Sequence, residues 1–230
     1  MKTTLPTFWF RWTGSFSGAA LIPACLTVAM SAPFALAASA EPAAQPAKIL
    51  IVGDSLSAGY GLSSGQGWVD LLTKKLGNEK IAANVVNASI SGDTTAGGAS
   101  RMPALLAKHK PTHVVIELGG NDGLRGAPVG GATGARANLL KMTETAQKAG
   151  AKVVIVGMRM PPNLGPSYTA QFEAMYAEVA KATQSALVPF FLEKLGTELT
   201  YFQPDRIHPT AVAQPMLLDT VWPVLLKALK

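Results

Sequence analysis

The chain contains a serine, a histidine and an aspartate whose positions would allow them to catalyse acyl transfer together. Ser55 closely follows the apolar run at 48–53, and Asp205 precedes His208 by three positions in the segment PDRIHPT. A serine hydroxyl is a weak nucleophile that needs a neighbouring base, and histidine suits this task because it titrates near neutrality. The imidazole in turn needs a carboxylate that fixes its tautomer, and this spacing lets Asp205 fold back onto Nδ1. Ser55, His208 and Asp205 are therefore candidates for nucleophile, base and orienting acid.

Hydrogen-bond donors for a tetrahedral intermediate are also present. Gly92 in SISGDTT offers an unobstructed backbone N–H, Asn121 in GGNDG offers a side-chain amide, and Ser55 offers its own N–H. Taken alone, GGND also fits a loop between a strand and a helix, and DRIHP fits a turn before the last helix. Asp54 adjoins Ser55, but adjacent side chains diverge at a turn, so we expect it to bond local backbone amides.

Short apolar runs alternate with amphipathic segments along the chain. Strands are expected at 48–53, 83–89, 112–119, 151–158 and 186–191, and helices at 67–77, 97–109, 133–149, 168–184 and 210–229. Such alternation is typical of an α/β protein whose parallel sheet is covered by helices on both faces. Chemistry in such folds collects beyond the carboxyl ends of the strands. Ser55, Gly92 and Asn121 each follow an expected strand, so we expect them at one edge of the sheet.

The sequence gives little support for a site at the other two histidines, for a metal site or for a nucleotide cofactor site. His109 ends an expected helix and His113 begins an expected strand, so both belong at the opposite edge of the sheet. The chain has no H-E-x-x-H motif and no cysteine cluster, so no metal is expected. The glycines of GYGLSSG have the wrong spacing for a dinucleotide site and no P-loop follows, so no cofactor is expected either.

The first 40 residues have the order of a secretory signal peptide. Lys2 and Arg11 precede a mostly apolar stretch, which leads to small residues and a cleavage site after Ala37 or Ala40. A membrane anchor is the alternative, which two prolines in the apolar stretch weaken. We expect a signal peptide at 1–40, a short leader at 41–47, one domain at 48–230, and a periplasmic or secreted protein without a stable anchor. The single cysteine, Cys25, lies in this segment, so export would bring no disulfide framework.

Charge and length narrow the possible partners. Residues 1–40 carry two basic and no acidic side chains, so a formal charge of +4 remains of the +6 on the whole chain. The basic residues are scattered, which favours an ordinary solvated surface over a nucleic-acid interface. The 190 residues after Ala40 suit one domain with a sizeable core, which we expect to be a monomer.

Four blocks, in order, resemble those of the SGNH (GDSL-type) hydrolases: GDSLSAGYGL, NASISGDTTAGG, ELGGNDGLRG and DRIHP. The resemblance covers about 50–230. It implies a flavodoxin-like three-layer α/β/α sandwich with a five-stranded parallel sheet, and a serine mechanism without a metal. Ser55 would be the nucleophile, His208 the base and then acid, and Asp205 its orienting carboxylate. The oxyanion hole would comprise the N–H groups of Ser55 and Gly92 and the side chain of Asn121.

The resemblance implies an exported hydrolase of carboxylic esters and thioesters, such as acyl-CoA thioesters, lysophospholipids and aryl esters. The apolar loop with Met160 and Pro161 is expected to border the acyl pocket. Two alternatives remain, a carbohydrate O-acetylesterase of the same fold and a non-catalytic binding module. One residue departs from the family pattern, because Arg206 stands where the family usually has glycine. If that position needs a positive φ, arginine is strained there, although we expect the change to be tolerated.

Overall fold

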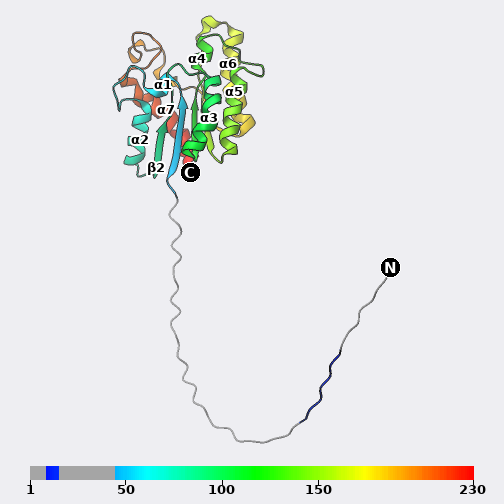
Figure 1. The fold of residues 1–230 in the computed structure, drawn as a ribbon. Helices are drawn as coiled ribbons and strands as arrows, with labels where there is room; N and C mark the ends of the chain where they lie inside the picture. The colour runs from blue at the N-terminus through cyan, green and yellow to red at the C-terminus, as the bar shows by residue number, and fades with distance from the viewer. Residues whose placement is uncertain (1–8, 16–44) are drawn as a thin grey trace. The chain divides into compact units, whose positions relative to one another are not determined.

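A parallel sheet of five strands forms the centre of the protein (Figure 1). The computed structural model describes residues 9–15 and 45–230, and residues 45–230 all belong to one compact unit. The strands are β1 (Ala47–Gly53), β2 (Ala83–Asn87), β3 (His113–Glu117), β4 (Lys152–Val156) and β5 (Ala186–Val188). They lie in the order β2-β1-β3-β4-β5, and all pairs are parallel. This is the flavodoxin-like order, which confirms the expected sheet.

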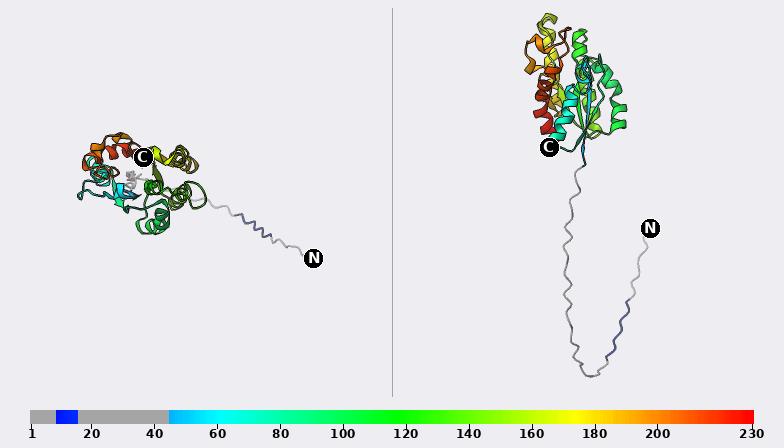
Figure 2. Two further views of the ribbon diagram at one scale, coloured as in Figure 1. Left: turned by 90° about the horizontal axis from the view of Figure 1, so that it is seen from above. Right: turned by 90° about the vertical axis from the view of Figure 1, so that its left-hand side faces the viewer.

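Helices cover both faces of the sheet. They are α1 (Ser55–Ala58), α2 (Trp68–Asn78), α3 (Thr95–His109), α4 (Gly120–Leu124), α5 (Ala135–Lys148), α6 (Pro166–Thr183) and α7 (Gln214–Leu229). The helices α2 and α7 pack together on one face, while α3, α5 and α6 cover the other (Figure 2). The expected three-layer sandwich is therefore confirmed.

The central strands are buried on both faces. The side chains of 49–52 in β1 and 114–116 in β3 are fully buried. This double burial explains why these strands appear in the sequence as unbroken apolar runs and not as an alternating pattern. On α6, Phe172 and Tyr176 face the same core and are likewise buried.

Several elements differ from the expected ones. The helices α1 and α4 were not expected, because four or five residues are too few to show a helical period and their sequences read as turns. The expected helix at 210–229 begins instead with a 3₁₀ turn, Ala211–Ala213, and α7 follows from Gln214. The strand β5 has only three residues, since it is followed by Pro189, which has no N–H to donate to a ladder.

The loops after β1, β2 and β3 meet at the carboxyl edge of the sheet, whereas two of the histidines lie at the amino edge. At the carboxyl edge, Gly53 pairs with Glu117, and Ile90 N donates to Gly53 O at 3.0 Å, so the loops after β1, β2 and β3 meet. At the amino edge lie His109, which ends α3, and His113, whose Nε2 is 3.0 Å from Ala228 O. Both histidines are therefore remote from the carboxyl edge, as expected. Within residues 9–15 and 45–230, no helix is long and apolar enough to cross a membrane.

Candidate active site

Ser55 stands at the turn where β1 ends and the first helix begins. It is the first residue of α1 and directly follows Asp54, whose side chain accepts a hydrogen bond from Leu56 N at 3.0 Å. This N-cap is the local backbone contact that was expected for Asp54. The helix ends at Gly59 in a left-handed conformation, with φ of 76°. The short helix thus fixes the position of Ser55 at the carboxyl edge of the sheet.

A small hairpin carries Asp205 and His208. Phe202 and Pro209 form an antiparallel bridge, and Gln203 N donates to His208 O at 2.7 Å. These bonds close the residues between them into a tight loop. The loop brings the aspartate back toward the histidine, as their spacing of three residues predicts.

The three side chains form one hydrogen-bonded series. His208 Nε2 lies 2.8 Å from Ser55 Oγ, and His208 Nδ1 lies 2.7 Å from Asp205 Oδ2. The other Asp205 oxygen accepts hydrogen bonds from His208 N at 3.0 Å and from Ile207 N at 2.9 Å. These backbone donors, the His208 N–H first, lower the pKa of Asp205 to about 2. Asp205 is therefore a carboxylate throughout the neutral and mildly acidic range.

Gln203 joins this hairpin to the loop after α1. Its side-chain nitrogen donates to Tyr60 O at 2.8 Å and to Pro209 O at 3.2 Å. Gly61 has φ of 71°, which favours glycine, and a Cβ atom there would also displace the end of the Gln203 side chain. The Tyr60 ring lies against His208, with ring centroids 4.5 Å apart. These contacts hold the histidine over the serine.

The other two expected oxyanion donors lie at or near α4: Asn121 belongs to this helix, and Gly92 is bonded to Arg125, the residue that ends it. Asn121 Nδ2 donates to Asp54 Oδ2 at 3.1 Å, which leaves its second amide hydrogen for another acceptor. Gly92 adopts φ of 80°, and its carbonyl accepts a hydrogen bond from Arg125 at 3.1 Å. Ser55 and Asn121 line one cavity, whereas Gly92 lies outside the lining of that cavity.

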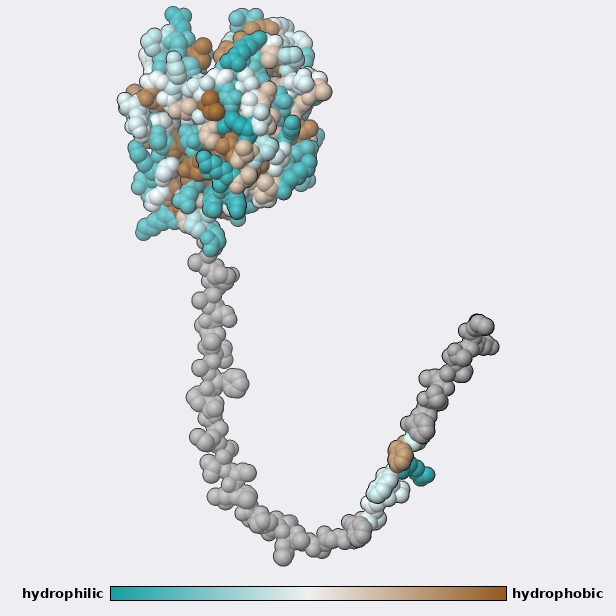
Figure 3. Space-filling model, in the orientation of Figure 1, coloured by the Kyte–Doolittle hydropathy of each residue, from teal (hydrophilic) through white to brown (hydrophobic). Residues whose placement is uncertain are grey.

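A cavity of about 340 Å³ opens beside Ser55, and its lining is mostly apolar. Met160 and Pro161 line it, as expected from the apolar loop after β4. Six further apolar residues line it that the sequence did not single out: Leu56, Leu124, Met158, Leu192, Phe202 and Ile207. They come from separate segments whose local patterns carry no sign of a common site. In the space-filling view the domain is notched at the end toward which β1 runs, with hydrophobic side chains beside the notch (Figure 3).

The serine, histidine and aspartate series occurs in several unrelated folds, so the family rests on comparison with known proteins. Residues 51–214 match the model of the GDSL-like Lipase/Acylhydrolase family. The chain belongs to this family.

Individual relatives of this GDSL-type hydrolase agree with the match. Esterase TesA of Pseudomonas aeruginosa is 54% identical over 178 residues, which cover 77% of this chain and 87% of the relative. Thioesterase 1/protease 1/lysophospholipase L1 of Escherichia coli is 42% identical over 171 residues, or 74% of this chain and 79% of the relative. The crystal structure of the psychrotrophic esterase EstA from Pseudoalteromonas sp., inhibited by monoethylphosphonate, has a TM-score of 0.74 and 39% identity. That match covers 78% of this chain and 97% of EstA.

Arg101 fastens the Gly92 loop of the hydrolase to the end of β1. Its guanidinium pairs with Asp93 at 2.8 Å and also donates to the backbone oxygens of Ala88 and Gly53. The side chains of Arg101 and Asp93 are only 19% and 11% exposed, so solvent screens this pair little. Sequence reasoning missed the pair, because nothing local marks two charges eight residues apart as partners.

Two buried carboxyl groups lie behind Ser55. Glu117 accepts a hydrogen bond from Ser57 Oγ at 2.7 Å, and Trp68 Nε1 donates to the same hydroxyl at 3.2 Å. Burial raises the pKa of Glu117 well above its usual value, and the nearby charge of Asp54 raises it further. Burial also raises the pKa of Asp54, to about 6. The surroundings of Glu117 therefore favour its neutral form, and Asp54 accepts the hydrogen bond from Asn121.

The raised pKa of Glu117 predicts how stability depends on pH. A carboxyl group of this kind stabilises the fold fully below its ordinary pKa of 4.5, and this contribution is lost as pH rises through the folded-state pKa. Glutamine keeps the shape and never ionises. The unfolding temperature of Glu117→Gln, relative to that of the unchanged protein, should therefore rise as the pH increases above 4.5 in thermal unfolding. The same change at the exposed Glu198 is the control, and a difference for Glu117→Gln that does not vary with pH would contradict the prediction.

Arg206 adopts the left-handed conformation, with φ of 60°. The position therefore has the positive φ at which arginine is strained, because a side chain in this conformation costs about 1–2 kcal/mol relative to glycine. The bonds between Asp205 and His208 are nevertheless intact, so the hairpin tolerates the arginine.

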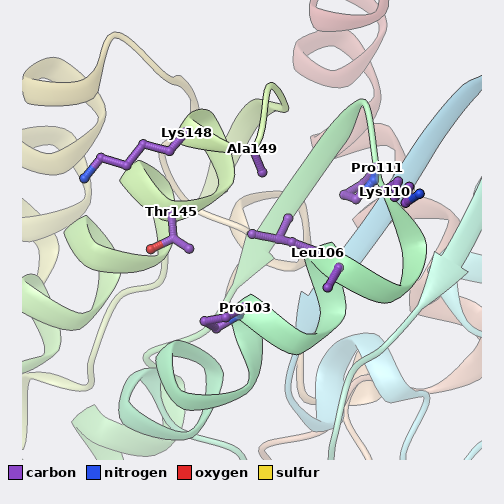
Figure 4. Close-up of a pocket in the computed structure, with 8 residues that line it drawn as sticks. Pro103, Leu106, Lys110, Pro111, Thr145, Lys148 and Ala149 are labelled. Carbon is purple, nitrogen blue, oxygen red and sulfur yellow. The ribbon is translucent and has the colours of Figure 1, made fainter.

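A larger hollow of about 630 Å³ lies between α3 and α5 (Figure 4). Leu106, Lys110 and Lys148 are among its lining residues, and both helices end there, at the amino edge of the sheet. It is lined by no histidine or carboxylate, so it offers no base for acyl transfer. Within the part of the chain that the structure describes, no three His, Cys, Asp or Glu residues are grouped so that they could hold a metal ion.

Proposed function

We propose that this protein hydrolyses carboxylic esters and thioesters through an acyl-enzyme formed on Ser55. The observation that carries the proposal is the series of hydrogen bonds from Ser55 through His208 to Asp205, at 2.8 and 2.7 Å, beside an apolar cavity. The names of the relatives support it, since one is called an esterase and another a thioesterase and lysophospholipase.

The first half of the proposed reaction acylates the serine. Ser55 Oγ attacks the acyl carbon while His208 Nε2 takes its proton, and the negative charge of the tetrahedral intermediate develops on the former carbonyl oxygen. The N–H groups of Ser55 and Gly92 and the amide of Asn121 are the proposed donors to that oxygen. When the intermediate collapses, His208 gives the proton to the leaving alcohol or thiol.

The second half returns the enzyme to its starting state. His208 takes a proton from water, the water oxygen attacks the acyl carbon, and a second tetrahedral intermediate forms. Its collapse releases the carboxylic acid and returns the proton from His208 to Ser55 Oγ. Asp205 stabilises the imidazolium in both halves and holds Nδ1 as the donor through Oδ2, because two backbone N–H groups fix its other oxygen, Oδ1.

The cavity favours fatty acyl groups over acetylated sugars. Met160 and Pro161 are the proposed contacts of the acyl chain, which would belong to an acyl-CoA thioester, a lysophospholipid or an aryl ester. A carbohydrate O-acetylesterase needs polar or stacking groups for a sugar, whereas this lining consists mostly of methionine, leucine and other apolar residues. A non-catalytic binding module has no need of the intact series at Ser55.

A series of esters of one alcohol, from acetyl to palmitoyl, tests the proposed substrate class. Burial of each methylene group contributes about 0.8 kcal/mol, which corresponds to a factor of about four. We therefore expect kcat/KM to rise by about this factor per added methylene until the cavity is filled. Highest activity on the acetyl ester, together with activity on acetylated sugars, would contradict the proposal and favour the O-acetylesterase.

We further propose that residues 1–40 direct export to the periplasm or beyond the cell, with cleavage after Ala37 or Ala40 and no lasting membrane anchor. The support is the order of Lys2, Arg11, an apolar stretch and small residues. Most of this segment, including both cleavage sites, lies outside the described residues. The domain at 48–230 is proposed to act as a monomer on small-molecule substrates, without nucleic acid.

A further inference from the structure

The strain at Arg206 calls for a reason. Lys80, Lys110 and Gln184 also have positive φ, but each lies at the carboxyl end of a helix, where a left-handed residue is common. Arg206, at φ of 60°, lies instead in the hairpin beside the cavity, and strain of this kind persists where the surrounding structure or the function compensates for it. The backbone of Arg206 has an ordinary role, because its N–H donates to Gln203 O at 2.8 Å, and glycine would serve that role equally well. The reason is therefore to be sought in the side chain.

Arg206 lines the same cavity as Ser55 and His208. The residue is exposed, and its side chain makes no hydrogen bond or ion pair among the described residues. The other arginine of the cavity, Arg159, is already engaged, since it pairs with Glu173 at 2.8 Å and lies 4.9 Å from the Phe190 ring centroid. Arg206 is thus the cation at this cavity that is free to bind a ligand.

The position of Arg206 in the hairpin indicates which part of a substrate it would meet. In the proposed reaction His208 delivers a proton to the leaving alcohol or thiol, so the leaving group must lie next to His208. Arg206 precedes His208 by two residues on the same hairpin, whereas Met160 and Pro161 border the cavity from the loop after β4. Arg206 therefore belongs to the leaving-group side of the cavity. The neighbouring carboxylate, Asp205, is already bonded to His208 and to two backbone N–H groups.

We propose that Arg206 binds the phosphate of a phosphate-bearing leaving group and so determines specificity for anionic acyl esters and thioesters. This inference rests on the proposed function. The planar guanidinium offers paired donors that fit two phosphate oxygens, and it stays charged at every pH of interest. Coenzyme A and a glycerophosphate headgroup share this chemistry. Arginine is retained at a left-handed position because the contact with phosphate outweighs the loss of stability.

Two pairs of substrates with the same acyl group test the proposal and separate the two phosphate sources. Octanoyl-CoA is compared with the neutral thioester octanoyl-N-acetylcysteamine, and octanoyl lysophosphatidylglycerol with neutral mono-octanoylglycerol. For Arg206→Ala we expect the ratio of kcat/KM, anionic over neutral, to fall about tenfold, mainly through KM. For Arg206→Lys the same ratio should fall less, because lysine keeps the positive charge although it lacks the paired donors of the guanidinium. Arg136→Ala removes an exposed positive charge from α5, outside the lining of the cavity, and should leave both ratios unchanged.

A fall in only one pair identifies coenzyme A or the glycerophosphate as the source of the phosphate. Unchanged ratios in both pairs, with the neutral substrates still cleaved, would overturn the role of Arg206 and leave the proposed function standing. Failure of the unchanged protein to cleave any of the four substrates would overturn both.

Thermal unfolding gives a second, independent readout. Arg206→Gly relieves the left-handed strain and should raise Tm by about 2–4 °C, while its substrate ratio falls as in Arg206→Ala. Arg206→Ala keeps a Cβ atom and should show no such rise. A lower Tm for Arg206→Gly would contradict the account of strain on which the proposal depends.

Discussion

Replacement of Ser55 by alanine should lower kcat for a medium-chain ester by about 10⁶-fold, the scale seen where a nucleophile and its base act as a unit. The serine oxygen is the atom that would carry the acyl group. In the variant, His208 Nε2 loses the hydroxyl that lies 2.8 Å away in the unchanged protein, so it has no nucleophile to deprotonate. The change removes one oxygen at the start of a helix whose cap, Asp54, is untouched. The fold should therefore survive, and initial rates with purified protein measure the effect.

The control for this variant is Ser64→Ala, an exposed serine on the loop that follows α1. It should keep full activity. If Ser55→Ala retained more than about a hundredth of the activity while its unfolding temperature was unchanged, Ser55 would not be the nucleophile.

Replacement of His208 by alanine is the second large expected effect, again a loss of about 10⁶-fold in kcat. His208 is the only base within hydrogen-bond distance of Ser55 Oγ among the described residues, and both proposed proton transfers pass through it. Asp205 cannot take its place, because its carboxylate is fixed by backbone N–H groups and its pKa is about 2, which makes it a poor base at neutral pH.

His109→Ala is the matched control, since this histidine ends α3 at the amino edge of the sheet. It should leave kcat and KM unchanged. Near-normal turnover by His208→Ala across the pH range would show that another group is the base.

The carboxyl-edge arrangement could be predicted because each participating segment follows a strand that the sequence marks clearly. The unbroken apolar runs before Ser55 and Asn121 are typical of strands buried on both faces, and the structure buries them so. The rule that loops meet beyond the carboxyl ends then brings these segments together without knowledge of any contact. The same rule separates His208 from His109 and His113.

Contacts between distant segments could not be predicted. The bond from Asn121 to Asp54 spans 67 positions, and that from Gln203 to Tyr60 spans 143. Neither follows from local pattern, because a polar residue in a loop has many possible partners. Glu117 is a further case, since the sequence shows only an acid at the end of an apolar run, and its burial against Ser57 depends on the whole sheet.

From the sequence, strain at Arg206 could be predicted only on the condition that its backbone has a positive φ. The sequence shows an arginine where a left-handed turn would favour glycine, and the observed φ of 60° settles that the turn is left-handed. Arg206 is the unpaired arginine of the cavity because Arg159 is paired with Glu173, and local sequence does not reveal that pair.

The most direct test of the account is to locate the covalent adduct of an active-site phosphonate. The protein is inactivated with an excess of the reagent, digested, and the peptides are mapped by mass spectrometry. We expect one adduct per chain, on the peptide that contains Ser55, and no adduct in Ser55→Ala. An adduct on a different residue, or a folded and active protein that takes up no label, would contradict it.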